Sequence, residues 1–154
     1  MIVEEDHIPP SSNECLEDFI ITFKASLDPR LWIKLIREES AELLAEEPGT
    51  VEHLKEAADL MYVLEGFYSV APDRMTLLLG DEEFSDMDNL IEDSTELLEA
   101  AETYYSHDVV YDAFLFVHES NMSKLGDDGQ PMFREDGKVL KGPNYKAPDL
   151  THLI

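Results

Sequence analysis

Residues 51–70 form a long and unusually apolar segment, and this segment constrains the fold more than any other part of the chain. Over residues 57–70 only Asp59 and Glu65 are charged. Thr50 is a typical N-cap residue and a proline follows the segment, so we predict one helix over its whole length. A helix that is apolar on all sides is buried on more than one side. We therefore expect other helices around it, and a subunit interface as well as a core.

Four further segments have the apolar spacing of amphipathic helices. With their start and stop signals they cover residues 11–23, 28–47, 85–105 and 108–126. Ser85 and Asp88 resemble a capping box, which would start the third of these four helices. A short apolar piece at 75–79 is expected to lie in a loop or a helical turn.

The composition changes at residue 126, where glycines, prolines and basic residues become more frequent. The sequences MFR and KVLK flank residues 135–137, Glu-Asp-Gly, as in a short hairpin. We therefore predict a single all-α domain over residues 1–154. Residues 11–125 would form a bundle of four or five helices, and residues 126–154 a basic, hairpin-bearing tail that closes on the site.

Two pairs of carboxylates lie on helix faces where core residues are expected. In the helix at 28–47, Glu39 is in the middle of the apolar stripe and Glu42 is at its edge. In the next helix, Glu56 and Asp59 are three residues apart and share one face. A Pro-Gly turn joins the two helices, so antiparallel packing would bring the four carboxylates together. Because unpaired buried carboxylates are costly and oxygen ligands suit Mg²⁺ or Mn²⁺, this pattern predicts a divalent-cation site.

Charge and cysteine content exclude other classes of function. The chain has 35 Asp and Glu against 11 Lys and Arg, a net charge of −24, which disfavours binding to nucleic-acid phosphates or to an anionic membrane. A single cysteine excludes an intrachain disulfide and a cysteine-based zinc site. The acidic start MIVEEDHIPP has no apolar signal region, so we expect a cytoplasmic protein. For the acids, a solvated surface remains the alternative to a cation site.

The carboxylate pattern resembles a known family. Glu38-Glu39-Ser-Ala-Glu42 followed by Glu56-Ala-Ala-Asp59 is similar to the EExxE…ExxD signature of the MazG-like all-α nucleoside triphosphate pyrophosphohydrolases. This superfamily includes phosphoribosyl-ATP pyrophosphohydrolase and the dimeric dUTPases. The sequences SNMSK and DGKVLKGPNY resemble the last helix and the C-terminal loop of small stand-alone members from bacteria and phages.

The resemblance implies hydrolysis of a nucleoside triphosphate between the α and β phosphorus atoms, which releases pyrophosphate. It implies two or more Mg²⁺ or Mn²⁺ ions on Glu39, Glu42, Glu56 and Asp59. It also implies a catalytic Glu38 that positions or deprotonates the attacking water. The first substrate to test is dGTP or GTP, with dCTP, dUTP and phosphoribosyl-ATP as alternatives. A homodimer or homotetramer is expected.

Residues near the C-terminal end are expected to bind the nucleotide: Asn121, Lys124, Lys138, Lys141 and Tyr145. The first two are three residues apart on the last helix and can share a face. The two tail lysines would close over the phosphates as point charges, although a solubilising role is the alternative. The tyrosine could stack on the base or anchor the tail. Phe19 and Trp32 could line a base pocket or belong to the core.

A rival hypothesis comes from a different class of protein. The net charge of −24 is also typical of an acidic interaction protein, for example a mimic of DNA. Such a protein would spread its acids over an exposed face and would need no metal. The register of the two carboxylate pairs favours the enzyme.

Overall fold

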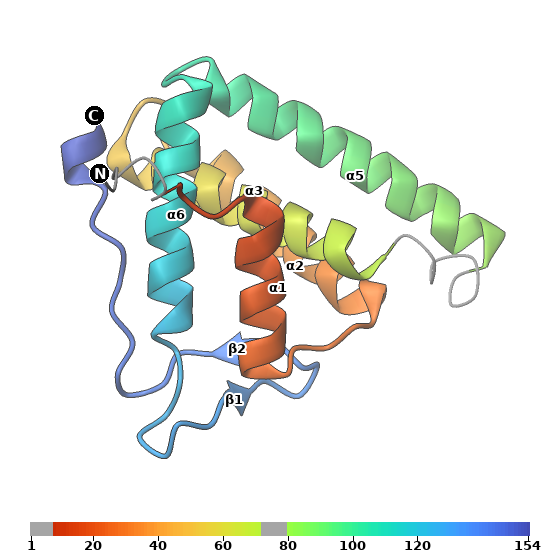
Figure 1. Cartoon of the computed structure of the whole chain (residues 1–154). Coiled ribbons are helices and arrows are strands. Elements are labelled where there is room, and N and C mark those ends of the chain that lie inside the picture. Colours follow the sequence, from red (N-terminus) through yellow and green to blue (C-terminus); the bar gives the residue numbers. More distant parts are fainter. Residues whose placement is uncertain (1–7, 72–79) are drawn as a thin grey trace, which may run out of the picture.

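The computed structural model describes residues 8–71 and 80–154, which are mainly helical (Figure 1). The helices in chain order are α1 (Ser12–Phe23), α2 (Pro29–Ala45), α3 (Val51–Val70), α5 (Asp81–Glu102) and α6 (His107–Met122). The short strands β1 (Met132–Phe133) and β2 (Val139–Leu140) and the 3₁₀ helix η2 (Thr151–Leu153) follow. The predicted all-α class is confirmed. The apolar piece expected at residues 75–79 lies outside the described residues.

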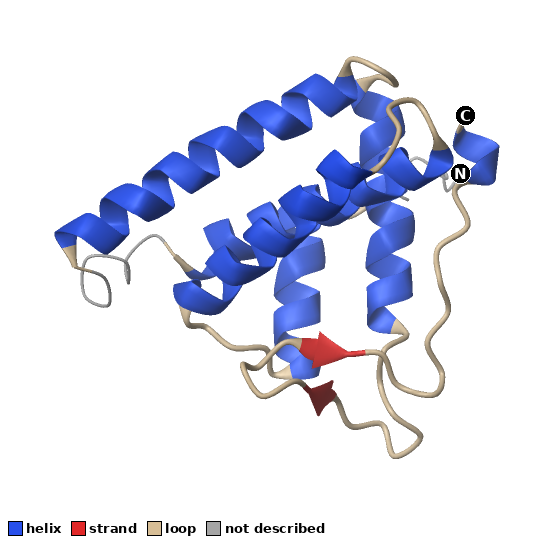
Figure 2. Cartoon of the chain, turned by 180° about the vertical axis from the view of Figure 1, so that it is seen from behind, coloured by secondary structure: helices blue, strands red, loops and turns tan. Residues whose placement is uncertain are grey.

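Helix α3 occupies the middle of the bundle and packs against α1, α2, α5 and α6. Figure 1 shows α1 and α6 in front of α2 and α3, and Figure 2 shows the same layers from behind. Leu54, Ala57, Ala58 and Leu60 of α3 are fully buried. Four helices of the same chain therefore bury the apolar segment, and this burial does not require a second subunit. The oligomeric state stays a prediction.

The close packing of α2 on α3 positions the candidate site. The Asp28 side chain accepts a hydrogen bond from the backbone N–H of Arg30 and so caps α2. Gly49 in the turn between the helices has φ +87°, a conformation that favours glycine. Gly66 allows the Trp32 ring to lie directly on α3, because a Cβ atom there would be 2.1 Å from that ring.

The predicted start of the helix at residue 85 is wrong. Helix α5 begins at Asp81 after Gly80, so Ser85 lies inside the helix and caps nothing. Asp81, Glu82 and Glu83 occupy the first turn, where carboxylates interact favourably with the positive end of the helix dipole. This acidic turn replaces a side-chain cap. No described helix combines the length and the apolarity that crossing a membrane requires.

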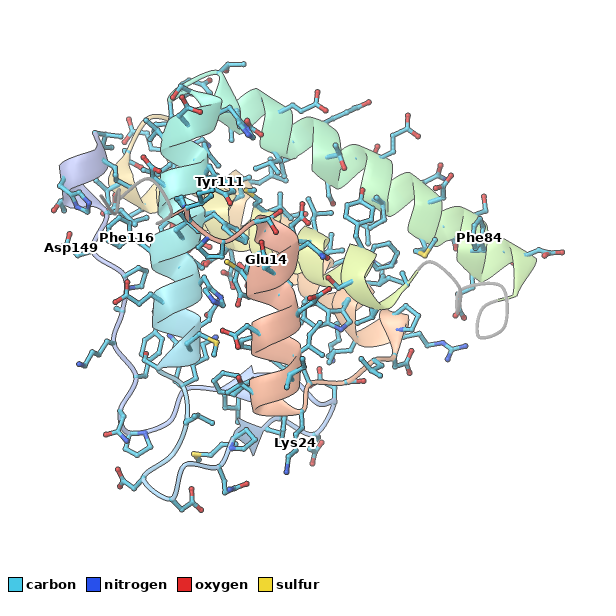
Figure 3. All side chains as sticks on the ribbon, viewed as in Figure 1. Glu14, Lys24, Phe84, Tyr111, Phe116 and Asp149 are labelled. Atoms are coloured by element: carbon cyan, nitrogen blue, oxygen red, sulfur yellow. The ribbon has the colours of Figure 1, made fainter. Side chains whose placement is uncertain are left out.

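Helix α6 ends at Met122, earlier than the expected stop at residue 126. The Ser120 carbonyl of the last turn accepts hydrogen bonds from both the backbone N–H of Ser123 at 3.0 Å and the hydroxyl of Ser123 at 2.6 Å. The same hydroxyl accepts a hydrogen bond from the Lys146 backbone N–H at 2.9 Å. In Figure 3, Phe116 of α6 lies beside the C-terminal segment near Asp149, and its ring meets that of His152 edge to face at 4.9 Å.

The residues between α6 and this segment include a short antiparallel hairpin. Met132 pairs with Leu140 and Phe133 pairs with Val139. The backbone N–H of Gly137 donates to the Arg134 carbonyl at 2.9 Å, and its φ of +99° fits the glycine position of this type of turn. The hairpin lies below the ends of α1 and α6 in the view of Figure 1.

Candidate functional site

Three of the four predicted metal-binding carboxylates converge between α2 and α3. One oxygen atom from each of Glu39, Glu56 and Asp59 lies within 4.8 Å of the other two. We call these three residues the acidic cluster. The side chains of Glu56 and Asp59 are only 12% and 17% exposed. The acidic cluster thus comes from two helices whose packing holds like charges together.

Burial raises the pKa of each carboxyl group in the acidic cluster, and repulsion between carboxylates adds to this for Glu39 and Glu56. For Glu39, burial acts first, and the charges of Asp59 and Glu42 add to it, so that its pKa rises to about 8. Burial and the charge of Asp59 raise the pKa of Glu56 to about 7, although Lys55 opposes this shift. Burial also raises the pKa of Asp59, again against the effect of Lys55. At neutral pH the acidic cluster therefore holds protons that solvated carboxylates would release.

Two oxygen atoms of the acidic cluster have no hydrogen-bond donor. Oε2 of Glu39 and Oε2 of Glu56 are buried and unpartnered within the described part of the chain. A buried acceptor without a partner costs free energy. A donor set made only of carboxylate oxygens suits a hard divalent cation such as Mg²⁺ or Mn²⁺. The residues present therefore fit such an ion.

The fourth predicted ligand, Glu42, is more exposed than the acidic cluster, but its carboxylate reaches those of Glu39 and Glu56. Its side chain is exposed, as expected for a residue at the edge of the apolar stripe of α2. It still lines the same cavity as Glu39 and Asp59, and its charge contributes to the raised pKa of Glu39. The structure thus places Glu42 at the mouth of the site rather than among the buried ligands.

Lys55 is a site residue that the sequence analysis missed. Its Nζ atom lies 2.9 Å from Oδ2 of Asp59 and 3.4 Å from Oε1 of Glu56. The spacing of Lys55 and Asp59, four residues apart on one helix, is a signal that could have indicated the pair. Lys55 therefore supplies a positive charge to the acidic cluster from α3, the helix that also carries Glu56 and Asp59.

A cavity of about 530 Å³ opens next to the acidic cluster. This volume is within the usual range for small-molecule sites. Predicted site residues that line it are Glu39, Glu42, Asp59, Asn121, Lys124, Lys138, Lys141 and Tyr145. Phe19 and Trp32 also line it, together with Leu31, Leu35 and Val63. The lining is thus partly charged and partly apolar and aromatic, and we call the second part the aromatic wall.

The three predicted lysines of the cavity differ in their surroundings. Burial lowers the pKa of Lys124 to about 8, and its ammonium forms no ion pair within 4 Å with any described residue. Lys138 is 3.4 Å from Oε2 of Glu38. Lys141 lies over the ring of Tyr145, 4.9 Å from its centroid, in a cation–π arrangement. Of these three lysines, Lys124 is therefore the best placed to bind an anion.

Glu38, the predicted catalytic acid, does not line the cavity. Its carboxylate accepts hydrogen bonds from Arg134 at 2.9 Å and from Lys138 at 3.4 Å, so it joins α2 to the hairpin. Asp136 of the hairpin extends this contact through ion pairs with Arg134 at 2.6 Å and with Lys34 at 2.8 Å. Arg134 and Asp136 were not predicted from the sequence, because nothing local indicates partners so distant along the chain.

The aromatic wall contains one further residue that the sequence analysis missed, Tyr62 of α3. Its hydroxyl is hydrogen-bonded to Nδ1 of His118 at 2.8 Å, and its ring meets that of Phe19 edge to face at 5.7 Å. Its place in an apolar helix is typical of a core residue, so the sequence carried no signal for it. These contacts fix the position of a polar hydroxyl within an otherwise apolar wall.

Comparison of the chain with protein-family models, with curated proteins and with solved structures finds no match. The fold and the site therefore define only an all-α protein with a mixed acidic, basic and aromatic cavity. Because one fold can support many activities, a function has to be inferred from the site itself.

Proposed function

We propose that the protein is a divalent-metal-dependent nucleoside triphosphate pyrophosphohydrolase of the MazG-like type. One observation carries this proposal: a single cavity is lined by Glu39 and Asp59 of the acidic cluster, though not by Glu56, and also by several lysines and an aromatic wall. Carboxylates bind divalent cations, ammonium groups bind phosphates, and aromatic rings stack on bases. A nucleoside triphosphate with its metal ion combines all three requirements. The resemblance of the carboxylate motif to the EExxE…ExxD signature supports the same conclusion.

Glu39, Glu56 and Asp59 would hold the metal, with Glu42 as a further ligand from the mouth of the cavity. When bound, a divalent cation would offset phosphate charge and lower the pKa of a coordinated water. The contribution of the chain is a set of carboxylates fixed on two packed helices. Their mutual repulsion favours cation binding, since a cation relieves it. We propose two or more ions per site, as the resemblance implies.

Lys124 would be the main phosphate ligand. Its ammonium lies in the cavity without an ion-pair partner in the described chain, and a phosphate would supply the missing negative charge. Lys138 and Lys141 reach the cavity from the tail and would add positive charge over the phosphates. Lys124 lies just beyond the end of α6 and not on it as expected, whereas Asn121 belongs to the last turn of α6 and would contribute a neutral hydrogen-bonding group.

The apolar wall would receive the base. Phe19, Trp32 and Tyr62 supply aromatic surface, and Tyr145 supplies another ring from the tail. dGTP or GTP stays the first substrate to test, since a purine offers the larger surface for stacking. The same wall would also accept the pyrimidines dCTP and dUTP, or phosphoribosyl-ATP.

The role of Glu38 as the group that positions or deprotonates the attacking water stays a prediction. Its carboxylate is engaged by Arg134 and Lys138, so it would have to exchange these partners for the water. A homodimer or homotetramer and a cytoplasmic location also belong to this proposal.

The test is a panel of ribo- and deoxyribonucleoside triphosphates incubated with the protein and Mg²⁺ in ¹⁸O-labelled water. The expected products are pyrophosphate and a nucleoside monophosphate that carries the label, because water attacks the α phosphorus. Release of orthophosphate, label in the pyrophosphate, or no turnover of any nucleotide would contradict the proposal.

The second candidate is the acidic interaction protein, and helix α5 favours it. Nearly all of its acidic side chains are exposed, from Asp81 to Glu99. This function would require no cation. Mg²⁺ would then raise the melting temperature no more than a monovalent salt of equal ionic strength, whereas the enzyme should gain stability by specific binding.

A further inference from the structure

Lys55 lies at the boundary between the protein surface and the buried carboxylates. It contacts two of the three carboxylates of the acidic cluster, and it also lines the cavity. On the basis of the proposed function, we propose that Lys55 is an exchangeable counter-ion of the acidic cluster. It neutralises the acidic cluster in the metal-free protein, leaves it when a divalent cation binds, and then offers its ammonium to the phosphates of the substrate.

Lys55 and the proposed metal ion would use the same oxygen atoms. Lys55 Nζ is 2.9 Å from Oδ2 of Asp59 and 3.4 Å from Oε1 of Glu56, and these carboxylates are ligands in the proposed metal site. A divalent cation on the same carboxylates would place two positive centres a few ångströms apart. Like charges at such distances repel strongly away from bulk water. Lys55 and the metal therefore compete for Asp59 and Glu56.

Lys55 can move without disturbing the fold. Its side chain is 36% exposed, so its outer part reaches solvent while the acids beneath it are largely buried. A lysine side chain is a flexible stem with a compact charge, which rotates readily between partners. Neither of its contacts is to a backbone atom. Displacement therefore breaks two ion-pair contacts and no part of the helical framework.

The displaced ammonium of Lys55 would remain in the cavity. Lys55 lines the same cavity as Lys124 and Lys138, so it stays near the place proposed for the phosphates. Metal binding would release a positive charge that had been neutralised by the acidic cluster. The metal and the phosphates would then favour one another's binding, and this coupling is reciprocal by thermodynamic necessity.

Lysine acetylation measured by peptide mass spectrometry tests the exchange directly on the unmodified chain. With EDTA, Lys55 is held by two carboxylates and should react slowly. With saturating Mg²⁺ its rate should rise roughly fivefold or more, while exposed Lys24 of the same sample stays constant and corrects for reagent effects. Glu39→Gln, which removes one proposed ligand, should abolish the rise.

Titration calorimetry with Mg²⁺ alone gives an independent measurement. Lys55→Met should bind Mg²⁺ about tenfold more tightly, because the competitor is gone. Lys124→Met is the matched control: it removes a nearby charge that forms no ion pair with the acidic cluster, so its gain should be clearly smaller. In the presence of Mg²⁺, Lys55→Met should also bind inorganic pyrophosphate more weakly than the wild type.

The outcomes separate this inference from the proposed function. If the wild type binds Mg²⁺ and releases pyrophosphate while the reactivity of Lys55 is unchanged, the exchange is wrong and the function stands. Equal Mg²⁺ affinity in Lys55→Met and the wild type would overturn the exchange in the same way. If the wild type binds no Mg²⁺ at all, the proposed function itself is wrong, and the exchange with it.

Discussion

The acidic cluster and helix α5 use the same residue types for opposite purposes. Helix α5 carries ten Asp and Glu residues in 22 positions, and nearly all of them are exposed. The acidic cluster has only three, Glu39, Glu56 and Asp59, but they are half-buried and within 4.8 Å of one another. Water and salt screen the charges on α5, whereas burial leaves those of the acidic cluster to repel. The burial and proximity of the carboxylates therefore indicate a functional site in this protein, whereas the number of acidic residues in a segment does not.

The largest expected effect of this difference is on catalysis. Glu39→Gln or Asp59→Asn should lower the initial rate of pyrophosphate release roughly a thousandfold, because each removes a ligand charge. Glu96→Gln on α5, which makes the same chemical change at an exposed position, should leave the rate unchanged. Near-full activity in both cluster variants would mean that the two regions do not differ in function.

The surroundings of Glu38 are intermediate between those of the acidic cluster and those of the acids on α5, since Glu38 is neither buried in the acidic cluster nor fully solvated. If it acts on the attacking water, Glu38→Gln should lower the turnover rate about a hundredfold. Arg134→Gln breaks the same ion pair from the hairpin side and should lower it less than tenfold. Equal losses in the two variants, measured as turnover rates at saturating substrate, would reduce Glu38 to an anchor for the hairpin.

The next largest effect is on the thermal stability of the protein in the presence of Mg²⁺. Mg²⁺ at a hundred times its dissociation constant should raise the melting temperature of the wild type by roughly 5–10 °C, since specific binding stabilises the folded state. Glu39→Gln should lose most of this gain, and Glu96→Gln should keep it. A gain that persists in Glu39→Gln would place the bound ions on exposed acids such as those of α5.

The smallest effect is the pH dependence of the metal-free protein. Because the pKa values of Glu39 and Glu56 are raised by burial to about 8 and about 7, the folded state binds more protons than the unfolded state above pH 6.5. Stability should therefore fall as the pH rises from about 6.5 to 8, by roughly 2–5 °C in melting temperature.

Measurements in EDTA check this sign. Starting at pH 6.5 avoids most of the titration of the two histidines His53 and His118, whose pKa values are lowered by burial. Glu39→Gln should show a shallower slope than Glu96→Gln. If the melting temperature of the wild type stayed constant or rose with pH, the acidic cluster would be solvated like the acids of α5.

Some of the fold and site could be predicted because the information is local. Helical periodicity placed Glu39 in an apolar stripe, and three-residue spacing placed Glu56 and Asp59 on one face. The glycine at 137 indicated a hairpin turn, and this residue adopts positive φ. The start of α5 was not predicted, because an acidic first turn competes with the capping signal at Ser85.

The sequence by itself determined which faces of α2 and α3 carry carboxylates, since side-chain direction follows from helical repeat. Only the tertiary structure decided that Glu42 lies at the mouth of the cavity, that Lys55 neutralises the acidic cluster, and that Arg134 holds Glu38 across 96 positions of the chain. These three features depend on the rotation of each helix about its own axis and on where the C-terminal tail packs against the bundle. Packing of the whole chain sets both, and no local pattern encodes them.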